Sequence, residues 1–136
     1  MDTIYKHPKR KTKVVFVQLG SPSEPTTKAL RKYLRKFLGD PRVIDINPWL
    51  WKIILNFFVL PFRPKKSAKL YARIWDGKSF PLITNTRDFT NNVREELKKI
   101  DPNGHVEVNH AFLLSPPYVN EVYDSWENDL KKGVGA

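Results

Sequence analysis

The sequence predicts an α/β fold in which helices flank a parallel sheet, and three observations predict it. Two apolar runs have the length and composition of strands, helical periodicity fills the segments between and after them, and Gly, Pro and Asp mark the joints. The order strand, helices, strand, helix is typical of right-handed crossover connections. A chain of 136 residues is long enough for one domain.

The first strand is expected at residues 14–19, a continuous apolar and β-branched run that ends at Gly20. Such runs are typical of strands buried on both faces. A helix follows, with Pro25 in its first turn and Ser23 or Glu24 as its cap. Its apolar stripe consists of Leu30, Tyr33, Leu34, Phe37 and Leu38. Its basic residues lie opposite the stripe, and Gly39-Asp40-Pro41 ends the helix.

The middle of the chain predicts three more helices after a short extended piece at residues 43–46. Residues 49–60 form a helix that is apolar nearly all round and that Pro61 ends. A third helix spans about residues 67–75. Thr86 or Asp88 caps a fourth, which turns Phe89 and the apolar residues after it inward.

The second strand is expected at residues 105–114, and Pro116-Pro117 closes it before a last helix that carries Val119, Val122, Tyr123 and Trp126. Two convincing strands make a marginal parallel sheet with both edges open. The sheet is therefore incomplete, and we expect a partner or further sequence to complete it. The chain is expected to form a homo-oligomer rather than a compact monomer.

Composition limits the classes of function. The net charge of +10 indicates either a solvated basic surface or an anionic partner such as acidic lipid or a carboxylated small molecule. Without a zinc finger or an RNP-like aromatic motif, we expect no nucleic acid partner. The absence of cysteine excludes disulfides and thiolate metal sites. Residues 1–13 are expected to be a basic flexible tail and residues 14–132 the domain, in a cytoplasmic protein that touches the membrane peripherally.

Several motifs, collinear over residues 14–99, resemble the ferrochelatase family. The strand and loop Phe16-Val17-Gln18-Leu19-Gly20-Ser21-Pro22 are similar to the opening of that family. The strongest match is Leu60-Pro61-Phe62-Arg63-Pro64-Lys65-Lys66-Ser67-Ala68, which leads to Tyr71, Ile74-Trp75, Ser79, Pro81-Leu82 and Thr86. The resemblance covers the N-terminal portion of the family's chain.

The resemblance implies a flavodoxin-like, chelatase-type half-sheet around a porphyrin cleft, in an enzyme of haem biosynthesis. The reaction would insert ferrous iron into protoporphyrin IX, both as substrates, with no tightly bound cofactor. The implied macrocycle contacts are Leu19, Ser21, Pro22, Tyr33 and Phe37, for which ordinary core packing is the alternative. Arg63, Lys66 and Ser79 match positions that hold the propionates, and solvated surface charge is the alternative for the two cations. Guanidinium groups suit that role because they bind carboxylates through paired hydrogen bonds.

The apolar segment after the first helix corresponds to the family's active-site lip. Its aromatic and aliphatic residues exceed what one buried stripe requires: Trp49, Trp51, Ile54, Phe57 and Phe58. Contact with a membrane surface is one interpretation, which the basic net charge favours. A fully buried helix is the other.

The chain departs from the family in its chemistry. The family's His-Ser-x-Pro-like histidine and its downstream glutamate are absent, and Phe112 and Leu113 replace a basic residue and a tyrosine. Among the three histidines, His110 is the candidate base or ligand, with a structural role as its alternative. No metal-ligand spacing is present. Three hypotheses result: ferrochelatase activity in a fuller context, a non-catalytic porphyrin- or haem-binding module, or a truncated chain that oligomerises.

Overall fold

The computed structural model describes residues 11–133, so His7 and most of the expected tail lie outside the described residues. A parallel pair of strands, β1 (Thr12–Gln18) and β2 (Val106–Phe112), forms the sheet, with Thr12 opposite Val106 and Gln18 opposite Phe112. The helices are α1 (Thr27–Leu38), α2 (Pro48–Ile54), α3 (Leu60–Ala72), α4 (Pro81–Ile100) and α5 (Val119–Gly133). The π-helical turn η1 (Leu55–Val59) joins α2 to α3. The mixed α/β prediction with two parallel strands is confirmed.

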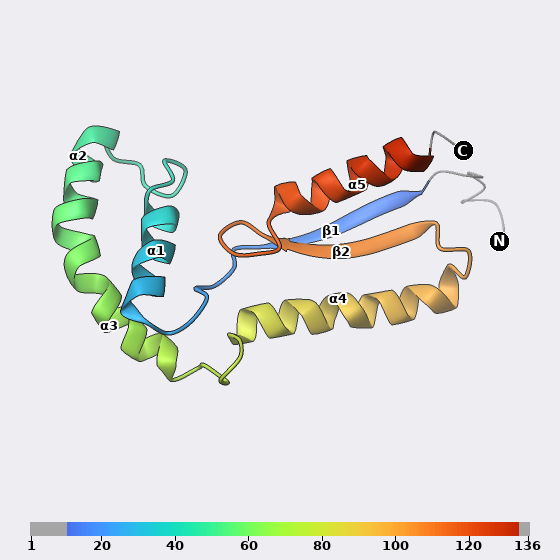
Figure 1. Ribbon diagram of the computed structural model, residues 1–136, viewed down its shortest axis with the longest axis horizontal. Helices are drawn as coiled ribbons and strands as arrows, with labels where there is room; N and C mark the ends of the chain where they lie inside the picture. The colour runs from blue at the N-terminus through green and yellow to red at the C-terminus, as the bar shows by residue number, and fades with distance from the viewer. Residues whose placement is uncertain (1–10, 134–136) are drawn as a thin grey trace.

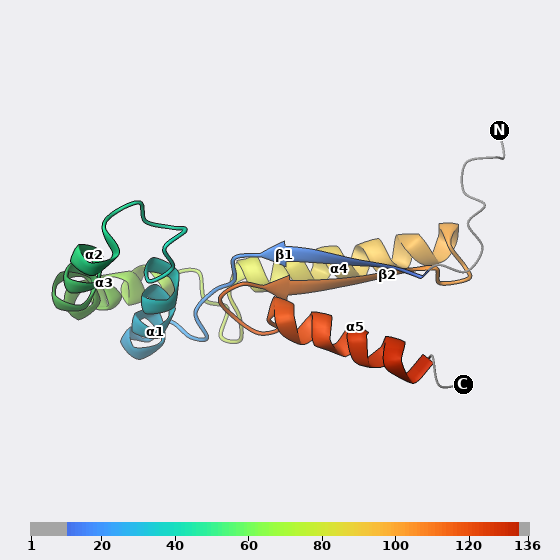
Figure 2. The same ribbon diagram turned by 90° about the horizontal axis from the view of Figure 1, so that it is seen from above.

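The two long helices cover opposite faces of the sheet (Figures 1 and 2). Phe16 packs edge-on against Phe89 of α4, with ring centroids 5.0 Å apart. The opposite face of the sheet carries Lys13, whose ammonium lies 5.3 Å from the ring centroid of Trp126 on α5. Since successive strand residues alternate between faces, these contacts fix which helix covers which side.

The expectation that the first strand is buried on both faces is wrong. Val17 keeps 45% of its surface exposed, and the other apolar side chains of β1 are half-buried. Both α4 and α5 pack mainly over β2, where Val108, Ala111 and Phe112 are buried. The strand therefore has the sequence of a central strand in the position of an edge strand.

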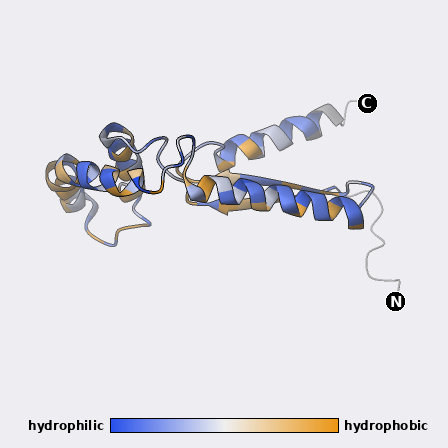
Figure 3. Ribbon diagram, turned by 90° about the horizontal axis from the view of Figure 1, so that it is seen from below, coloured by the Kyte–Doolittle hydropathy of each residue, from blue (hydrophilic) through white to orange (hydrophobic). Residues whose placement is uncertain are grey.

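The helices α1, α2 and α3 form a lobe at the opposite end of the molecule from the free ends of α4 and α5 (Figure 1). α1 packs against α3, and the Arg31 Nε–H donates to the Leu60 carbonyl at 3.3 Å. This lobe contains many hydrophobic residues (Figure 3), and among them Trp49, Phe57 and Phe62 are exposed. The expected lip belongs to this lobe, so it lies far from the ends at which β1 and β2 begin (Figure 1).

Residues 48–72 form one continuous helical run, not the two helices expected on either side of Pro61. Proline has no N–H to donate and its ring crowds the preceding turn. Here the helix widens into a π-turn just before Pro61, where the Leu60 N–H donates to the Leu55 carbonyl. Such a π-turn gives the ring space within a helix, so Pro61 falls in the first turn of α3.

Four local features also differ from the sequence predictions. Thr26, rather than Ser23 or Glu24, caps α1 by accepting from the Ala29 N–H at 3.2 Å. α4 begins at Pro81, so Thr86 is buried inside it and donates to the Leu82 carbonyl at 2.7 Å. Residues 43–46 form no strand, and β1 begins at Thr12, inside the segment expected to be tail.

Candidate functional site

A cavity of about 400 Å³ lies where the loops after both strands meet α1 and the segment before α4. Its backbone frame depends on Gly20, whose φ of +94° favours glycine. A Cβ there would also collide with the Ser115 hydroxyl. The Ser21 N–H donates to the same Ser115 Oγ at 3.3 Å. This hydrogen bond links the loop that follows β1 to the loop that follows β2 at the cavity.

Aromatic rings make up much of the cavity wall. Tyr33 of α1 is only 8% exposed, and its hydroxyl donates to the Gly20 carbonyl at 3.3 Å. Burial, followed by the nearby Tyr71, raises the pKa of Tyr33 from 10.0 to about 12. Trp75 and Phe80 also line the cavity, and they pack with ring centroids 4.7 Å apart. Tyr33 therefore stays neutral at physiological pH and presents an apolar ring with a satisfied hydroxyl.

The loop before α4 brings a cation and a hydroxyl to the cavity. Asp76 Oδ1 accepts from the Ser79 N–H at 2.6 Å and from the Lys78 N–H at 2.7 Å. These backbone hydrogen bonds, that of Ser79 first, lower the pKa of Asp76. The ionised carboxylate thereby fixes the turn that carries Lys78 and Ser79 into the cavity lining.

Three lysines line the cavity together with its aromatic rings: Lys32, Lys36 and Lys78. The Lys36 ammonium lies 4.1 Å from the ring centroid of Tyr118, which also lines the cavity. This arrangement suits a flat apolar ligand that carries negative charge at its rim. Sequence reasoning placed Lys32 and Lys36 on a solvent face and did not single out Lys78. The i, i+4 spacing on α1 and the neighbour Ser79 were the available signals.

The residues proposed from the sequence separate into two groups. Ser21, Pro22, Tyr33 and Ser79 line the cavity together. The others are not among its lining residues: Leu19, Phe37, Arg63 and Lys66. Phe37 stacks on Tyr33 behind the cavity wall at 6.2 Å, and Arg63 and Lys66 are exposed on α3.

The expected lip is an exposed surface, which excludes the fully buried helix. The exposed fractions are 74% for Trp49, 70% for Phe57 and 65% for Phe58. Trp51 is half-buried and donates through its indole N–H to the Leu38 carbonyl at 2.7 Å, while Ile54 is half-buried. None of the helices described has the length and apolar character needed to cross a membrane.

A second cavity, of about 640 Å³, lies between the end of α1 and α2. Ile44, Trp51 and Leu55 contribute apolar walls, and Lys52 contributes a cation. It adjoins the exposed aromatic residues of α2, so it belongs to the lip and not to the cavity at the strand ends.

His110 faces α4 and is not among the cavity-lining residues. Its Nδ1 is buried without a hydrogen-bond partner in the structure. Burial, followed by the charges of Arg94 and Arg87, lowers its pKa. Among residues 11–133, no group of three or more His, Cys, Asp or Glu side chains is placed to hold a metal ion.

The fold and the cavity define an α/β protein with an aromatic, lysine-rimmed site at the strand ends. Comparison with known proteins gives the family. The ferrochelatase family model matches residues 11–134. The chain is 38% identical over 121 residues to the ferrochelatase of Idiomarina loihiensis, covering 89% of this chain and 32% of the relative. It is 41% identical over 116 residues to the coproporphyrin III ferrochelatase of Enterococcus faecalis, covering 85% and 35%.

A shorter segment is more similar still. The chain is 62% identical over 66 residues to the ferrochelatase of Psychrobacter cryohalolentis, covering 48% of this chain and 20% of the relative. This chain belongs to the ferrochelatase family. It matches between 20% and 35% of the length of these relatives.

Proposed function

We propose that this chain forms the porphyrin-binding N-terminal part of a ferrochelatase, with protoporphyrin IX and ferrous iron as the substrates of the complete enzyme. One observation carries the proposal. The two strand-end loops, α1 and the loop before α4, all within the family match, converge on one cavity lined by aromatic rings and lysines.

The ligand chemistry agrees with this lining. Protoporphyrin is a flat apolar ring system with two carboxylates at one edge. Apolar walls gain free energy by removing such a ring from water, and a few cations at the rim fix its orientation. The side chains of Tyr33, Trp75 and Phe80 would supply the wall, while Lys36 and Lys78 would supply charge. The cavity volume lies within the range of about 300–1,000 Å³ of small-molecule sites.

Arg63, Lys66 and Ser79 are proposed to hold the propionates, as the family resemblance implies. Ser79 lies in the cavity lining, and the two cations lie on α3, whose chain leads through Trp75 into the same lining. Arg63 and Lys66 are three residues apart on one helix, a spacing that places both on one face. Two cations so spaced could meet the two carboxylates of one porphyrin edge.

Metal insertion needs removal of two pyrrole protons and delivery of iron, and we propose that this chain supplies neither by itself. His110 lies against α4 rather than in the cavity, so it is not positioned to remove those protons. Porphyrin binding without family-like turnover is the activity expected of the isolated chain.

Absorbance titration with protoporphyrin tests the proposal. The wild-type chain should bind it, and Ser79→Trp should block the cavity and reduce binding at least about tenfold. Ser125→Trp on the exposed surface of α5 is the matched control and should bind like the wild type. Equal binding by both variants would place the porphyrin elsewhere or show that binding is non-specific.

We also propose that the lip contacts a membrane surface, because its aromatic side chains are exposed together on one stretch of helix. Trp49, Phe57 and Phe58 would enter the interface, and the net charge of +10 would favour anionic lipid. Co-sedimentation with vesicles of anionic and of zwitterionic lipid tests this. Trp49→Ser with Phe57→Ser should weaken binding to the anionic vesicles, and an unchanged bound fraction would refute the contact.

A further inference from the structure

The cavity beside the lip, of about 640 Å³, lies between the end of α1, one face of α2 and the loop of residues 39–47, which joins these two helices (Figure 1). Every residue that lines it falls between Arg35 and Asn56, so one short stretch of chain forms its walls. Positions 48, 51, 52, 55 and 56 contribute to it, a spacing that places them on one face of the helical run. It shares no lining residue with the cavity at the strand ends, so it is a separate site.

The inner surface of this cavity is aliphatic and aromatic. Leu55 is 5% exposed, and Ile44 and Trp51 are half-buried. The Trp51 indole N–H donates to the Leu38 carbonyl at 2.7 Å, so the one polar atom of the ring is satisfied within the chain. These side chains therefore offer a ligand apolar contact and require no hydrogen bond from it.

Positive charge lies at the same cavity. Arg35 and Lys52 line it and are exposed, and neither takes part in an ion pair among residues 11–133. None of the lining residues in the described part of the chain is an aspartate or a glutamate. Two carboxylates lie in the adjoining loop, and one of them, Asp40, accepts from the Arg42 N–H at 2.9 Å. An apolar interior with two cations is complementary to an anionic amphiphile.

We propose that this cavity holds an acyl chain of an anionic phospholipid, with the lipid phosphate between Arg35 and Lys52. The choice of a membrane lipid rests on the lip contact proposed above, because the exposed Trp49 and Leu50 belong to the helix that forms one wall. A lip that enters the interface brings the cavity to the level of the headgroups, where the phosphate meets both cations.

The headgroup should determine which lipid binds. An acyl chain gains little by leaving the bilayer for the cavity, because both surroundings are apolar. The phosphate gains the two cations, and each basic residue near an anionic headgroup strengthens binding by about fivefold. The site should therefore select lipids by their charge.

Binding of a short-chain lipid below its micellar concentration tests the site without a bilayer. The probes are dihexanoyl phosphatidylglycerol, which is anionic, and dihexanoyl phosphatidylcholine, which is zwitterionic, each titrated into the 136-residue chain. The NMR resonance of the Trp51 indole N–H should shift. Phosphatidylglycerol should bind at least about fivefold more tightly than phosphatidylcholine.

Substitutions test the charge and the apolar interior separately. Arg35→Gln with Lys52→Gln should remove the preference for the anionic lipid and weaken its binding by about 25-fold. Lys65→Gln with Lys69→Gln, two exposed cations on α3, is the matched control and should bind like the wild type. Ile44→Trp should fill the cavity and abolish binding. Circular dichroism establishes whether each variant is folded, and the charge variant, at exposed positions, decides the matter if Ile44→Trp is not.

The outcomes separate this site from the lip contact. Equal binding of the two lipids, an unchanged affinity of the charge variant, or no shift of Trp51 would overturn the proposal. Vesicle binding without binding of monomeric lipid would also overturn it and would leave the lip contact standing. Displacement of the lipid by protoporphyrin would assign the cavity to the porphyrin and overturn it as well. Binding of monomeric lipid without vesicle binding would support the site and refute only the lip contact.

Discussion

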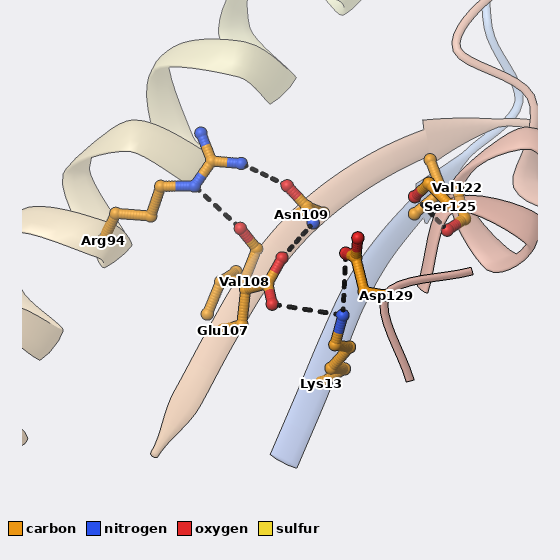
Figure 4. A network of polar contacts seen from close by, with 8 residues as sticks. All are labelled: Lys13, Arg94, Glu107, Val108, Asn109, Val122, Ser125 and Asp129. Carbon is orange, nitrogen blue, oxygen red and sulfur yellow. Dashed lines mark hydrogen bonds and ion pairs between the residues drawn. The ribbon is translucent and has the colours of Figure 1, made fainter. Parts of the chain in front are cut away.

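The guanidinium of Arg94 on α4 donates through Nε to the Val108 carbonyl of β2 at 2.7 Å (Figure 4). It also bonds the side chain of Asn109 on the neighbouring position of the strand. A helix that precedes a strand thereby satisfies a carbonyl at the strand's outer edge, where water or another chain would otherwise bind.

Arg94→Met should lower the free energy of unfolding by about 1.5–3 kcal/mol, because methionine keeps the bulk of the stem but not the charge-assisted hydrogen bonds. Urea unfolding measures the change. Arg87→Met, an exposed arginine on the same helix, serves as control and should be close to neutral. A cost for Arg94→Met no larger than that of the control would mean that water replaces the arginine without loss.

Arg63→Ala combined with Lys66→Ala should weaken protoporphyrin binding by about 10- to 100-fold, through loss of charge-assisted hydrogen bonds to the propionates. The same double variant should not change binding of the dimethyl ester, which has no carboxylates. Lys69→Ala, another exposed cation on α3, is the control. Equal weakening for acid and ester would refute the carboxylate role, and Lys36→Ala would then test the cavity lysines in its place.

The stability of the fold should fall in alkali because of Tyr33. Its pKa is raised from 10.0 to about 12, so the folded chain keeps a proton that the unfolded chain releases. The contribution is complete below pH 10 and is lost as the pH rises toward 12, at about 1.4 kcal/mol per unit. Tyr33→Phe should remove this part of the pH dependence in urea unfolding. Parallel curves for wild type and variant between pH 10 and 12 would contradict it.

Because of His110, the stability of the fold should also fall in acid. Burial and two neighbouring arginines lower its pKa, so below its ordinary value of 6.5 the unfolded chain binds a proton that the folded chain rejects. Stability is therefore present above pH 6.5 and decreases as the pH falls. His110→Leu should flatten this acid-side slope in urea unfolding. A chemical shift titration of His110 centred above 6.5 would show that the ring is not shielded as the structure indicates.

The purified chain should not insert ferrous iron into protoporphyrin at a rate typical of the family. General acid–base catalysis contributes about 10²–10⁴-fold, and His110 lies outside the cavity where it would be needed. A stopped assay of metalloporphyrin formation, with a complete ferrochelatase as the positive control, measures this. Family-like turnover would show that the chain contains a proton acceptor that neither its sequence nor its cavity identifies.

The sequence alone determined the elements whose signal is local. The apolar runs predicted both strands, the stripe through Leu30 and Tyr33 predicted α1, and the collinear motifs predicted the family. Four of the eight expected porphyrin contacts line one cavity, since the strand-end loop and α1 were identified together. Periodicity and turn residues are properties of neighbouring positions, so they can be recognised without any knowledge of the fold.

Tertiary structure decided what depends on segments distant in sequence. Whether Pro61 ends a helix depended on the π-turn before it and on the packing of α3 against α1. The hydrogen bond between Ser21 and Ser115, and the position of Lys78 in the lining of the same cavity, depended on how the strands pair. The apolar sequence of β1 predicted full burial, yet burial is set by where α4 and α5 pack, and both lie over β2. The pattern of side chains indicates which residues of a strand can be buried, but the elements packed against the strand determine which of them are buried.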